Sequence, residues 1–600
     1  MGLDGRLFKR KQIERPHWRQ STPQSVAWRV TMGRMTRLVS PLTLCVLAAC
    51  SSKPSQDCAE GFEADAQGRC HPQTASADTG GISDLDPDSD SDSGDDTGDV
   101  PEPDEEDDRF DFGPVLACES PEAEVSYTEV GIEWGLAEPE IWKGEHAENG
   151  SVAVADFDLD GDLDVIMGFD GQAPILYTRD ADGFIGTDLP VEDGLSQMGM
   201  ADLDNDGRLD IIFGGMSETV LLNRETGWET VDFPSAQWED ETGLGHIKSA
   251  QPMDIDRDGI QDAYALVSYA DASGIASMDF IAWGVGDGTF IADTTVVPLD
   301  WGYQKGFDLQ WFDWDADGWQ DVYVVNELAT GRSKSETRPE GNFFLRNNEG
   351  SLELAHDECL CSVRHDGMGA GLGDFNMDGR PDLILAATGS NLLLQQLDDG
   401  TYVEVGQATG ADTLDGTIST MAWGAIFVDF DNDGLQDIAV AEGDLWHIHT
   451  DDPIIKDMAF NMVRQVEPNR FELANEAGFG QMGSWRSIVA ADHNGDGVLD
   501  FIVSDVETRP IFLLSNGCTR DNWLEVGAPH GSRIEIAAGG KTWTGWANTA
   551  SSFGGAVEPV VHFGLGAVDA VDRISIQKPD GIIVEYEGRL DVRRRIQLKH

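Results

Sequence analysis

Seven short acidic segments constrain this chain more than any other feature of its sequence. Each segment has Asp or Asn at positions 1, 3, 5 and 9 and glycine at position 6. Their starts lie 46 to 63 residues apart (Asp156 to Asp202, Asp429 to Asp492). Recurrence at this interval indicates a repeat array. The segments, called loops 1 to 7 below, are DFDLDGDLD (156–164), DLDNDGRLD (202–210), DIDRDGIQD (254–262), DWDADGWQD (313–321), DFNMDGRPD (374–382), DFDNDGLQD (429–437) and DHNGDGVLD (492–500).

Short apolar runs flank every loop. A run of small and β-branched residues precedes it, such as SVAVA before Asp156, and a second run such as DVIMG or DIIFGG follows it. A third run and a turn come next, as in LLLQQLDDGTYVEV. Four short strands per 45–60 residues are typical of a β-propeller blade. The sequence therefore predicts an all-β chain with a seven-bladed propeller over residues 118–519.

The ends of the array suggest how the ring closes. The last repeat stops after IFLLSNG at Gly517 without a fourth strand, whereas SYTEVGIEWGL (126–136), before loop 1, resembles the fourth strands of other repeats. We expect the N-terminal strand to complete the last blade, because a paired edge is protected from aggregation. Cys118 and Cys518 would then lie close together, and a disulfide there is one of the open outcomes.

The spacing of the carboxylates predicts calcium binding. Calcium takes six to eight oxygen ligands at about 2.3–2.6 Å. In loop 1, Asp156, Asp158, Asp160 and Asp164 supply side chains, and the residue at position 7, Asp162, supplies its backbone carbonyl. An EF-hand would need Glu at position 12, where this chain has Met167. We therefore predict up to seven Ca²⁺ ions in β-turn loops.

The same five positions are the predicted ligands in the other loops. Asn376 and Asn494, at position 3 of loops 5 and 7, are neutral oxygen donors and should lower affinity there. The remaining predicted ligands are Asp202, Asp204, Asp206, Arg208 and Asp210; Asp254, Asp256, Asp258, Ile260 and Asp262; Asp313, Asp315, Asp317, Trp319 and Asp321; Asp374, Asp378, Arg380 and Asp382; Asp429, Asp431, Asp433, Leu435 and Asp437; and Asp492, Asp496, Val498 and Asp500.

The loops and their flanking strands resemble the FG-GAP repeats of the integrin α-subunit propeller and its bacterial relatives. The segments NWLEVGAPHGSRIEIAAGGKTW (522–543) and VHFGLGAVDAVDRISIQKPDG (561–581), with Ser551-Ser552 between them, resemble the ASPIC/UnbV module of the cartilage acidic protein family. This resemblance implies a small β-rich module over residues 520–590. We expect residues 591–600 to form a basic tail.

The N-terminal region predicts export. Residues 38–49 form an apolar run preceded by Arg34 and Arg37, as in a signal peptide, and we expect translation to start at Met32 or Met35. The end of the run, LAAC, resembles a bacterial lipobox, which implies cleavage after residue 49 and a diacylglycerol on Cys50; an ordinary signal peptide is the alternative. The folded part would then belong to a lipoprotein of the bacterial outer membrane or cell surface.

Between the anchor and the propeller we expect a tether. Residues 50–73 would form the lipidated N-terminus with a short loop closed by Cys58 and Cys70, and residues 74–113 are a low-complexity acidic linker. Cys359 and Cys361 are expected to form a strained disulfide or to remain free thiols. Because Asp and Glu number 110 against 40 Lys and Arg, giving a net charge of −70, binding to nucleic acid through bulk charge is excluded.

Two functional hypotheses follow. One is a membrane-anchored, calcium-dependent adhesion-type protein that recognises an extracellular protein or glycan. The other is a propeller enzyme, a hydrolase or lyase, with its site at the channel mouth opposite the calcium loops. Candidate mouth residues, each six to ten positions before a loop, are His146, His246, Lys305, His365 and Arg486. We find no nucleophile elbow, phosphate-binding glycine loop or HExxH motif, which favours the first hypothesis.

Overall fold

The structure of the protein is a computed structural model. It describes residues 62–64, 70–72, 107–122, 124–136, 150–169, 172–181, 183–191, 195–215, 218–234, 239–240, 243–244, 246–268, 279–295, 305–327, 341–363, 365–412, 421–443, 458–506 and 509–599. The chain divides into two compact units, Met1–Thr97 and Gly98–His600. In the first, strands β1 (Phe62–Ala64) and β2 (Cys70–Pro72) pair antiparallel. Cys50, Cys58 and most of the predicted acidic linker lie outside the described residues.

The second unit is built almost entirely of antiparallel β-sheet, as predicted. Its described helices are the single turns α1 (His356–Cys359) and α2 (Gly406–Thr409) and a 3₁₀ turn at Asn475–Ala477. None of the described helices has the length and apolar character needed to span a bilayer.

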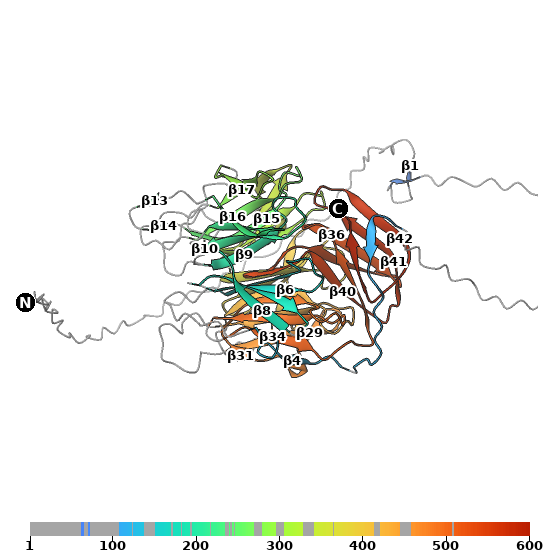
Figure 1. Cartoon of the computed structure of the whole chain (residues 1–600). Coiled ribbons are helices and arrows are strands. Elements are labelled where there is room, and N and C mark those ends of the chain that lie inside the picture. Colours follow the sequence, from blue (N-terminus) through green and yellow to red (C-terminus); the bar gives the residue numbers. More distant parts are fainter. Residues whose placement is uncertain are drawn as a thin grey trace, which may run out of the picture. The chain divides into compact units, whose positions relative to one another are not determined.

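Seven four-stranded units follow one another along the chain. In Figure 1 their strands run in colour from cyan through green and yellow to orange. In each unit, four neighbouring strands pair antiparallel. The units are unit 1, β5 (Gly150–Ala155), β6 (Asp164–Phe169), β7 (Ile175–Asp180) and β8 (Gly183–Asp188); unit 2, β9 (Leu195–Ala201), β10 (Asp210–Gly215), β11 (Thr219–Arg224) and β12 (Gly227–Asp232); unit 3, β15 (His246–Met253), β16 (Asp262–Ser268), β17 (Phe280–Gly284) and β18 (Phe290–Asp293); unit 4, β19 (Lys305–Phe312), β20 (Asp321–Glu327), β21 (Phe343–Asn348) and β22 (Ser351–Leu354); unit 5, β23 (Gly367–Gly373), β24 (Asp382–Ala387), β25 (Leu392–Gln396) and β26 (Tyr402–Glu404); unit 6, β27 (Ala422–Val428), β28 (Asp437–Glu442), β29 (Met458–Glu467) and β30 (Arg470–Leu473); and unit 7, β32 (Trp485–Ala491), β33 (Asp500–Asp505), β34 (Ile511–Ser515) and β4 (Tyr127–Glu129). Three further two-residue strands, β13 (Glu239–Asp240), β14 (Gly243–Leu244) and β31 (Met482–Gly483), lie outside this pattern.

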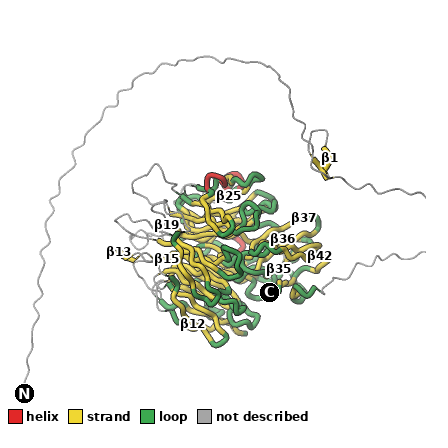
Figure 2. The backbone as a smooth tube through the Cα atoms, turned by 90° about the horizontal axis from the view of Figure 1, so that it is seen from above, coloured by secondary structure: helices red, strands yellow, loops and turns green. Residues whose placement is uncertain are grey.

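The first strands of the units lie side by side in order, and β32 of unit 7 contacts β5 of unit 1. Figure 2 shows two of these neighbours, β15 and β19. The hydrophobic core lies between the units. One cluster joins Val154 of unit 1 to Val489 and Ile502 of unit 7, and another joins Ile384 of unit 5 to Val440 of unit 6. Because each unit buries its faces against two neighbours, the series forms a closed ring of inner strands.

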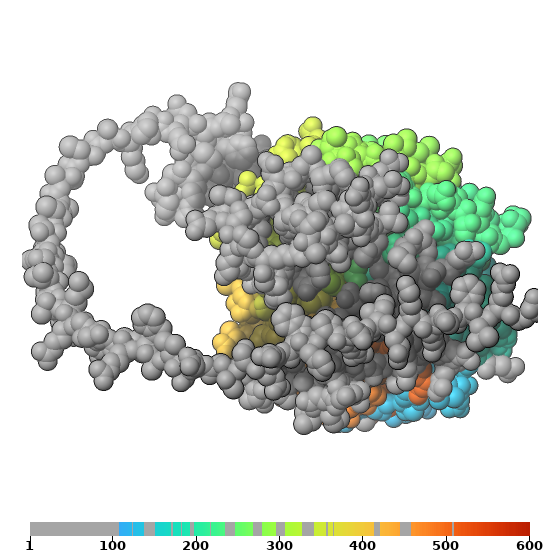
Figure 3. Space-filling view, turned by 90° about the vertical axis from the view of Figure 1, so that its left-hand side faces the viewer, coloured from blue at the N-terminus to red at the C-terminus, as the bar shows by residue number. Residues whose placement is uncertain are grey.

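The N-terminal strand completes the last unit, as expected from the sequence. Strand β4 pairs antiparallel with β34, with Glu129 opposite Leu513. The Arg509 guanidinium bonds Glu129 at 2.8 Å, and a disulfide joins Cys118 to Cys518. In Figure 3 the blue N-terminal residues lie beside orange residues of the last units.

The C-terminal part forms a module of two four-stranded sheets, and its boundaries correct two predictions. Strand β3 (Phe110–Phe112), from the predicted linker, pairs with β43 (Arg594–Leu598), from the predicted basic tail. Phe110 and Phe112 pack on Tyr586, so these apolar side chains order the end of an acidic tract. The remaining strands are β35 (Asn522–Gly527) and β40 (Val560–Gly566) in one sheet, and β36 (Ser532–Ala538), β37 (Lys541–Ala547), β41 (Ala570–Gln577) and β42 (Ile583–Asp591) in the other.

Candidate metal centre

The seven acidic loops occupy equivalent places in the seven units. In each unit, position 1 directly follows the first strand, and the aspartate at position 9 begins the second strand. The residue at position 4 is left-handed, from Leu159 (φ 64°) to Gly495 (φ 69°), and so is the glycine at position 6, such as Gly161 (φ 99°). Glycine is needed at position 6 because a Cβ strains this conformation. The left-handed position 4, where Leu, Arg and Met occur, was not predicted.

Carboxylates at positions 1 and 5 shape the turn. In loop 1 the Asp156 carboxylate accepts the amide hydrogens of Asp160 (3.0 Å) and Gly161 (2.9 Å), and Asp160 accepts that of Asp162 (2.9 Å). The bond from the position 7 amide to the position 5 carboxylate recurs in all seven loops. The local sequence thus builds the loop from its own backbone hydrogen bonds.

The aspartate at position 9 ties the loop to the rest of its unit. Asp164 accepts the amide hydrogens of Phe157, at position 2, and of Arg179, on the third strand (3.1 and 2.8 Å). A third-strand amide donates to the same carboxylate in every unit. Position 9 therefore fixes the distance between loop and third strand, a role that the sequence pattern did not reveal.

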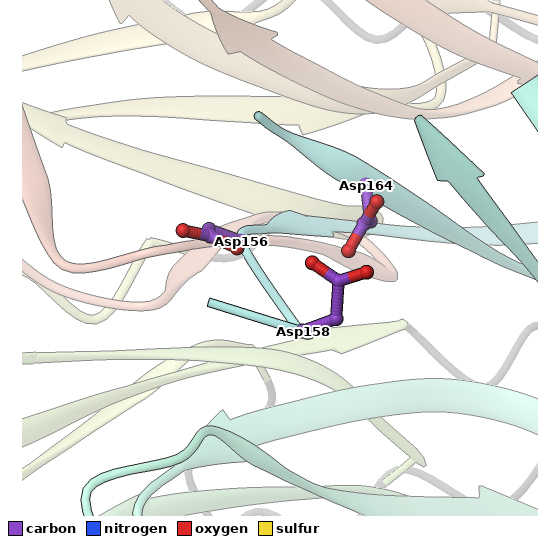
Figure 4. Close-up of side chains that lie close together, drawn as sticks. All are labelled: Asp156, Asp158 and Asp164. Atoms are coloured by element: carbon purple, nitrogen blue, oxygen red, sulfur yellow. The ribbon is translucent and has the colours of Figure 1, made fainter. Parts of the chain in front are cut away.

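Five of the loops bring three carboxylates together. In each, one oxygen from every carboxylate lies within 4.8 Å of the others, and Figure 4 shows those of loop 1. Loops 5 and 7 contain no such triad among the described residues, since Asn376 and Asn494 replace the second aspartate; their amides instead donate to Asp378 and Asp496. The triads are Asp156, Asp158 and Asp164; Asp202, Asp204 and Asp206; Asp254, Asp256 and Asp262; Asp313, Asp315 and Asp321; and Asp429, Asp431 and Asp437.

The loop electrostatics fit a divalent cation. Burial raises the pKa of Asp164 to about 7 and that of Asp254 to about 6, and nearby carboxylates add to both shifts. Buried oxygens without a hydrogen-bond partner remain at Asp254 Oδ1, Asp382 Oδ2 and Asp431 Oδ1. Burying a carboxylate oxygen without a partner costs free energy, and a bound cation would supply that partner. All of the available donor atoms are oxygens, which are the ligands that a hard cation such as calcium prefers.

Arginines from the third strands approach three loops, which the sequence pattern did not predict. Arg224 pairs with Asp204 in loop 2. Arg346 Nη2 lies 2.5 Å from Asp315 in loop 4. In loop 6, Arg464 Nη2 lies 2.5 Å from Asp431. The guanidinium groups offset part of the repulsion between carboxylates in these loops.

Side-chain amides link four of the loops to the next unit. Each of these Asn or Gln residues lies on the third strand of its unit, and its backbone amide donates to the position 9 aspartate of the same unit. Its side-chain amide donates to the backbone carbonyl at position 2 of the preceding unit's loop. Adjacent loops are thereby connected through hydrogen bonds. The bonds are Asn223 to Phe157 (2.7 Å), Asn347 to Ile255 (2.9 Å), Gln396 to Trp314 (2.9 Å) and Gln465 to Phe375 (3.1 Å).

Loop 6 lies beneath the C-terminal module. The Gly566 amide donates to the Asn432 carbonyl oxygen (2.8 Å), and the Trp543 indole donates to that of Gly434 (3.1 Å). The His562 ring lies 2.8 Å from the Asn432 side-chain oxygen. Loop 6 is therefore a contact between the ring and the module.

Four of the predicted channel-mouth residues stand in or just before the first strand of a unit. His146 lies outside the described residues, and His246 and Lys305 begin β15 and β19. His365 bonds the Ser390 carbonyl oxygen of its own unit (2.6 Å).

The prediction for Arg486 as a mouth residue is wrong. Arg486 is only 1% exposed, and its guanidinium lies 4.0 Å from the Trp423 ring centre. Its Nη1 donates to the carbonyl oxygen of Trp485 (2.9 Å). Stacking and hydrogen bonding hold this charge inside the ring, so it is a packing residue.

Two disulfides lie in the described part of the chain. Besides Cys118–Cys518, a disulfide joins Cys359 to Cys361 across the left-handed Leu360 (φ 52°). Both Cys359 and Cys361 are fully buried in the core between units 4 and 5.

Two family models match the chain. Residues 337–440 match the FG-GAP-like repeat and residues 527–600 match the ASPIC and UnbV family. The second match extends through β43, in agreement with the corrected boundary of the module.

Curated relatives and solved structures are similar at low identity. Cartilage acidic protein 1 of Xenopus tropicalis is 25% identical over 485 residues, covering 72% of this chain and 71% of the relative. The Homo sapiens protein of that name is 27% identical over 263 residues, 41% of this chain and 38% of its own length. An Agrocybe aegerita lectin structure, described as recognising non-reducing terminal N-acetylglucosamine, has TM-score 0.36 and 14% identity over 69% of this chain and 98% of that chain. YCF48 bound to D1 peptide has TM-score 0.36 and 10% identity over 68% and 98%.

These findings agree on the make-up of the protein. The chain combines an FG-GAP-like repeat region with an ASPIC and UnbV segment and is similar over most of its length to cartilage acidic protein 1.

Proposed function

We propose that this chain is a calcium-dependent cell-surface binding protein whose seven units form a seven-bladed, integrin-like β-propeller. The seven equivalent acidic loops, five of them with three converging carboxylates, carry this proposal. In each loop, calcium would be held by side chains at positions 1, 3, 5 and 9 and by the carbonyl at position 7. It would supply positive charge at the centre of a turn that otherwise concentrates buried negative charge.

Calcium counting tests the metal part of the proposal. Titration calorimetry of the full chain should give at least four calcium ions per chain, and magnesium should compete poorly because it prefers smaller octahedral sites. Chelation should lower the melting temperature, since each site at the tight end of the extracellular range contributes about 1.4 kcal/mol at millimolar calcium. Fewer than four ions, or a melting curve that chelator does not move, contradicts calcium binding.

The ligand is an extracellular protein or glycan of unidentified structure. Arrays of glycans and extracellular matrix proteins, probed with the full chain in about millimolar calcium and again with chelator, test this part. Binding lost on chelation supports the proposal. Equal binding under both conditions contradicts calcium dependence, even where calorimetry has shown that calcium binds.

Anchoring through Cys50 is a separate proposal, supported by the LAAC sequence after a basic and then apolar stretch. Mass spectrometry of the mature N-terminus should find a diacylated Cys50, and the protein should fractionate with membranes. An unmodified N-terminus at another residue contradicts it.

A further inference from the structure

A short hairpin leaves the C-terminal module and enters the ring of inner strands. It comprises β38 (Ala550–Ser552) and β39 (Gly555–Val557), between β37 and β40 of the module. We call residues 548–557 the hub segment. Phe553 at its turn is fully buried, although the segment joins two sheets of another module.

The hub segment extends the inner strand of unit 1. Strand β39 runs parallel to β5, with Gly555 opposite Val152 and Val557 opposite Val154. The Val152 amide donates to the Gly554 carbonyl oxygen (3.1 Å). The C-terminal module therefore adds a strand to the first unit of the ring, although β5 and β39 lie near opposite ends of the chain.

Side chains of the hub segment bond the inner strands of four more units. All of these bonds use main-chain groups of the ring, so they do not depend on the ring side chains. They run from Asn548 to the Trp311 carbonyl of unit 4 (2.7 Å), from Thr549 to the Met200 carbonyl of unit 2 (2.6 Å), from Ser551 to the Ile488 carbonyl of unit 7 (3.2 Å), and from the Ala425 amide of unit 6 to the Ser552 hydroxyl (2.8 Å).

Phe553 contacts units 3 and 5, which the hydrogen bonds of the hub segment do not reach. Its Cβ lies 3.1 Å from the position that a Cβ at Gly369 of unit 5 would take. Lys248 Nζ of unit 3 lies 5.7 Å from its ring centre. Its ring also packs against Phe307 (6.3 Å) and Trp423 (5.2 Å). The hub segment therefore contacts all seven units.

We propose that the hub segment, an uncharged β-hairpin, binds the inner strands of all seven units and holds the units together at their inner edge. Buried main-chain groups on the inner strands need partners, and the hub supplies them. The ASPIC and UnbV segment thus serves as a structural part of the ring. The inference does not depend on bound calcium.

Hydrogen exchange of the full chain, read strand by strand, tests the proposal. Phe553→Ala and Ser552→Ala each remove one hub contact, and Phe280→Ala, at another fully buried phenylalanine, lies in the core between units 2 and 3. We expect both hub variants to lower amide protection at least tenfold in inner strands of separated units, including β9, β19 and β32. Phe280→Ala should lower protection only in units 2 and 3.

The pattern across the strands decides the outcome. Loss of protection confined to units 3 to 6, which line Phe553, overturns the proposal, and so does unchanged protection in both hub variants. If Phe553→Ala does not fold while Phe280→Ala does, Ser552→Ala alone gives the test. In that variant a change limited to β27, which loses the Ala425 bond, also overturns it.

Discussion

The side-chain amide of Asn347 donates a 2.9 Å hydrogen bond to the backbone carbonyl of Ile255, 92 residues earlier in the chain. The backbone amide of Asn347 donates to Asp321, which begins the second strand of the same unit. One residue therefore contacts the loop of its own unit and the loop of the preceding unit.

Asn347→Leu should destabilise the ring by about 1–3 kcal/mol, because it leaves the buried Ile255 carbonyl without a donor. The matched control is Asn348→Leu, since Asn348 is the exposed neighbour on the same strand. Denaturant unfolding of the two variants measures the difference. Equal stability of both proteins would show that the link between units contributes nothing.

Loop 6 should control docking of the C-terminal module. With calcium present, Asp431→Asn weakens the proposed cation site of loop 6, whose Gly434 and Asn432 backbone carbonyls accept the Trp543 and Gly566 hydrogens, so amide protection in β37 and β40 should fall at least fivefold. Asp158→Asn makes the same change at position 3 of loop 1 and should leave that protection intact. Similar losses in the two variants would mean that loop 6 has no special role.

Stability should fall on acidification through His530. Its Nδ1 accepts the Thr549 amide hydrogen (3.1 Å) and its Nε2 donates to the Pro252 carbonyl (2.9 Å), so only the neutral ring fits. Burial lowers the pKa of His530 from 6.5 to about 4. The unfolded chain therefore binds the extra proton first, and stability is lost as pH falls from 6.5 towards 4.

At pH 5 the cost of this group is about 2 kcal/mol relative to neutral pH. His530→Gln keeps one acceptor and one donor without titrating, so its unfolding free energy should fall by about 2 kcal/mol less between pH 7.5 and pH 5. Other titrating groups, His493 among them, are common to the two proteins and cancel in the difference. Parallel pH profiles would rule His530 out.

Removing the Cys118–Cys518 disulfide should cost about 6 kcal/mol on the chain-entropy model, because it closes a loop across 400 residues. The double variant Cys118→Ser, Cys518→Ser, compared with the parent by denaturant unfolding, measures this. Cys359–Cys361 remains intact in both proteins. A cost under about 1 kcal/mol would indicate that β4 is held by its strand pairing alone.

Much of the repeat region could be predicted from the sequence, because the residues of each loop determine the local structure of that loop. Asp at positions 1 and 9 and glycine at position 6 mark the ends of two strands and the turn between them. The hub segment could not be predicted. Its Ser-Ser-Phe-Gly-Gly sequence has no strand periodicity, and its partners lie hundreds of residues earlier in the chain, as Met200 and Val152 do. Arg486 was misplaced for a similar reason, since its offset before loop 7 does not reveal the Trp423 ring.

Because the N-terminal strand β4 completes unit 7, this unit can form only after the end of the repeat region has been synthesised. Glu129 and Arg509 are 380 residues apart. At about 5–20 residues per second, roughly 20–80 seconds pass during synthesis before β4 can meet its partner. The hub is made later still. Until then β4 and the inner strands present open edges, so this protein depends on whatever shields unfinished sheets while it is being made.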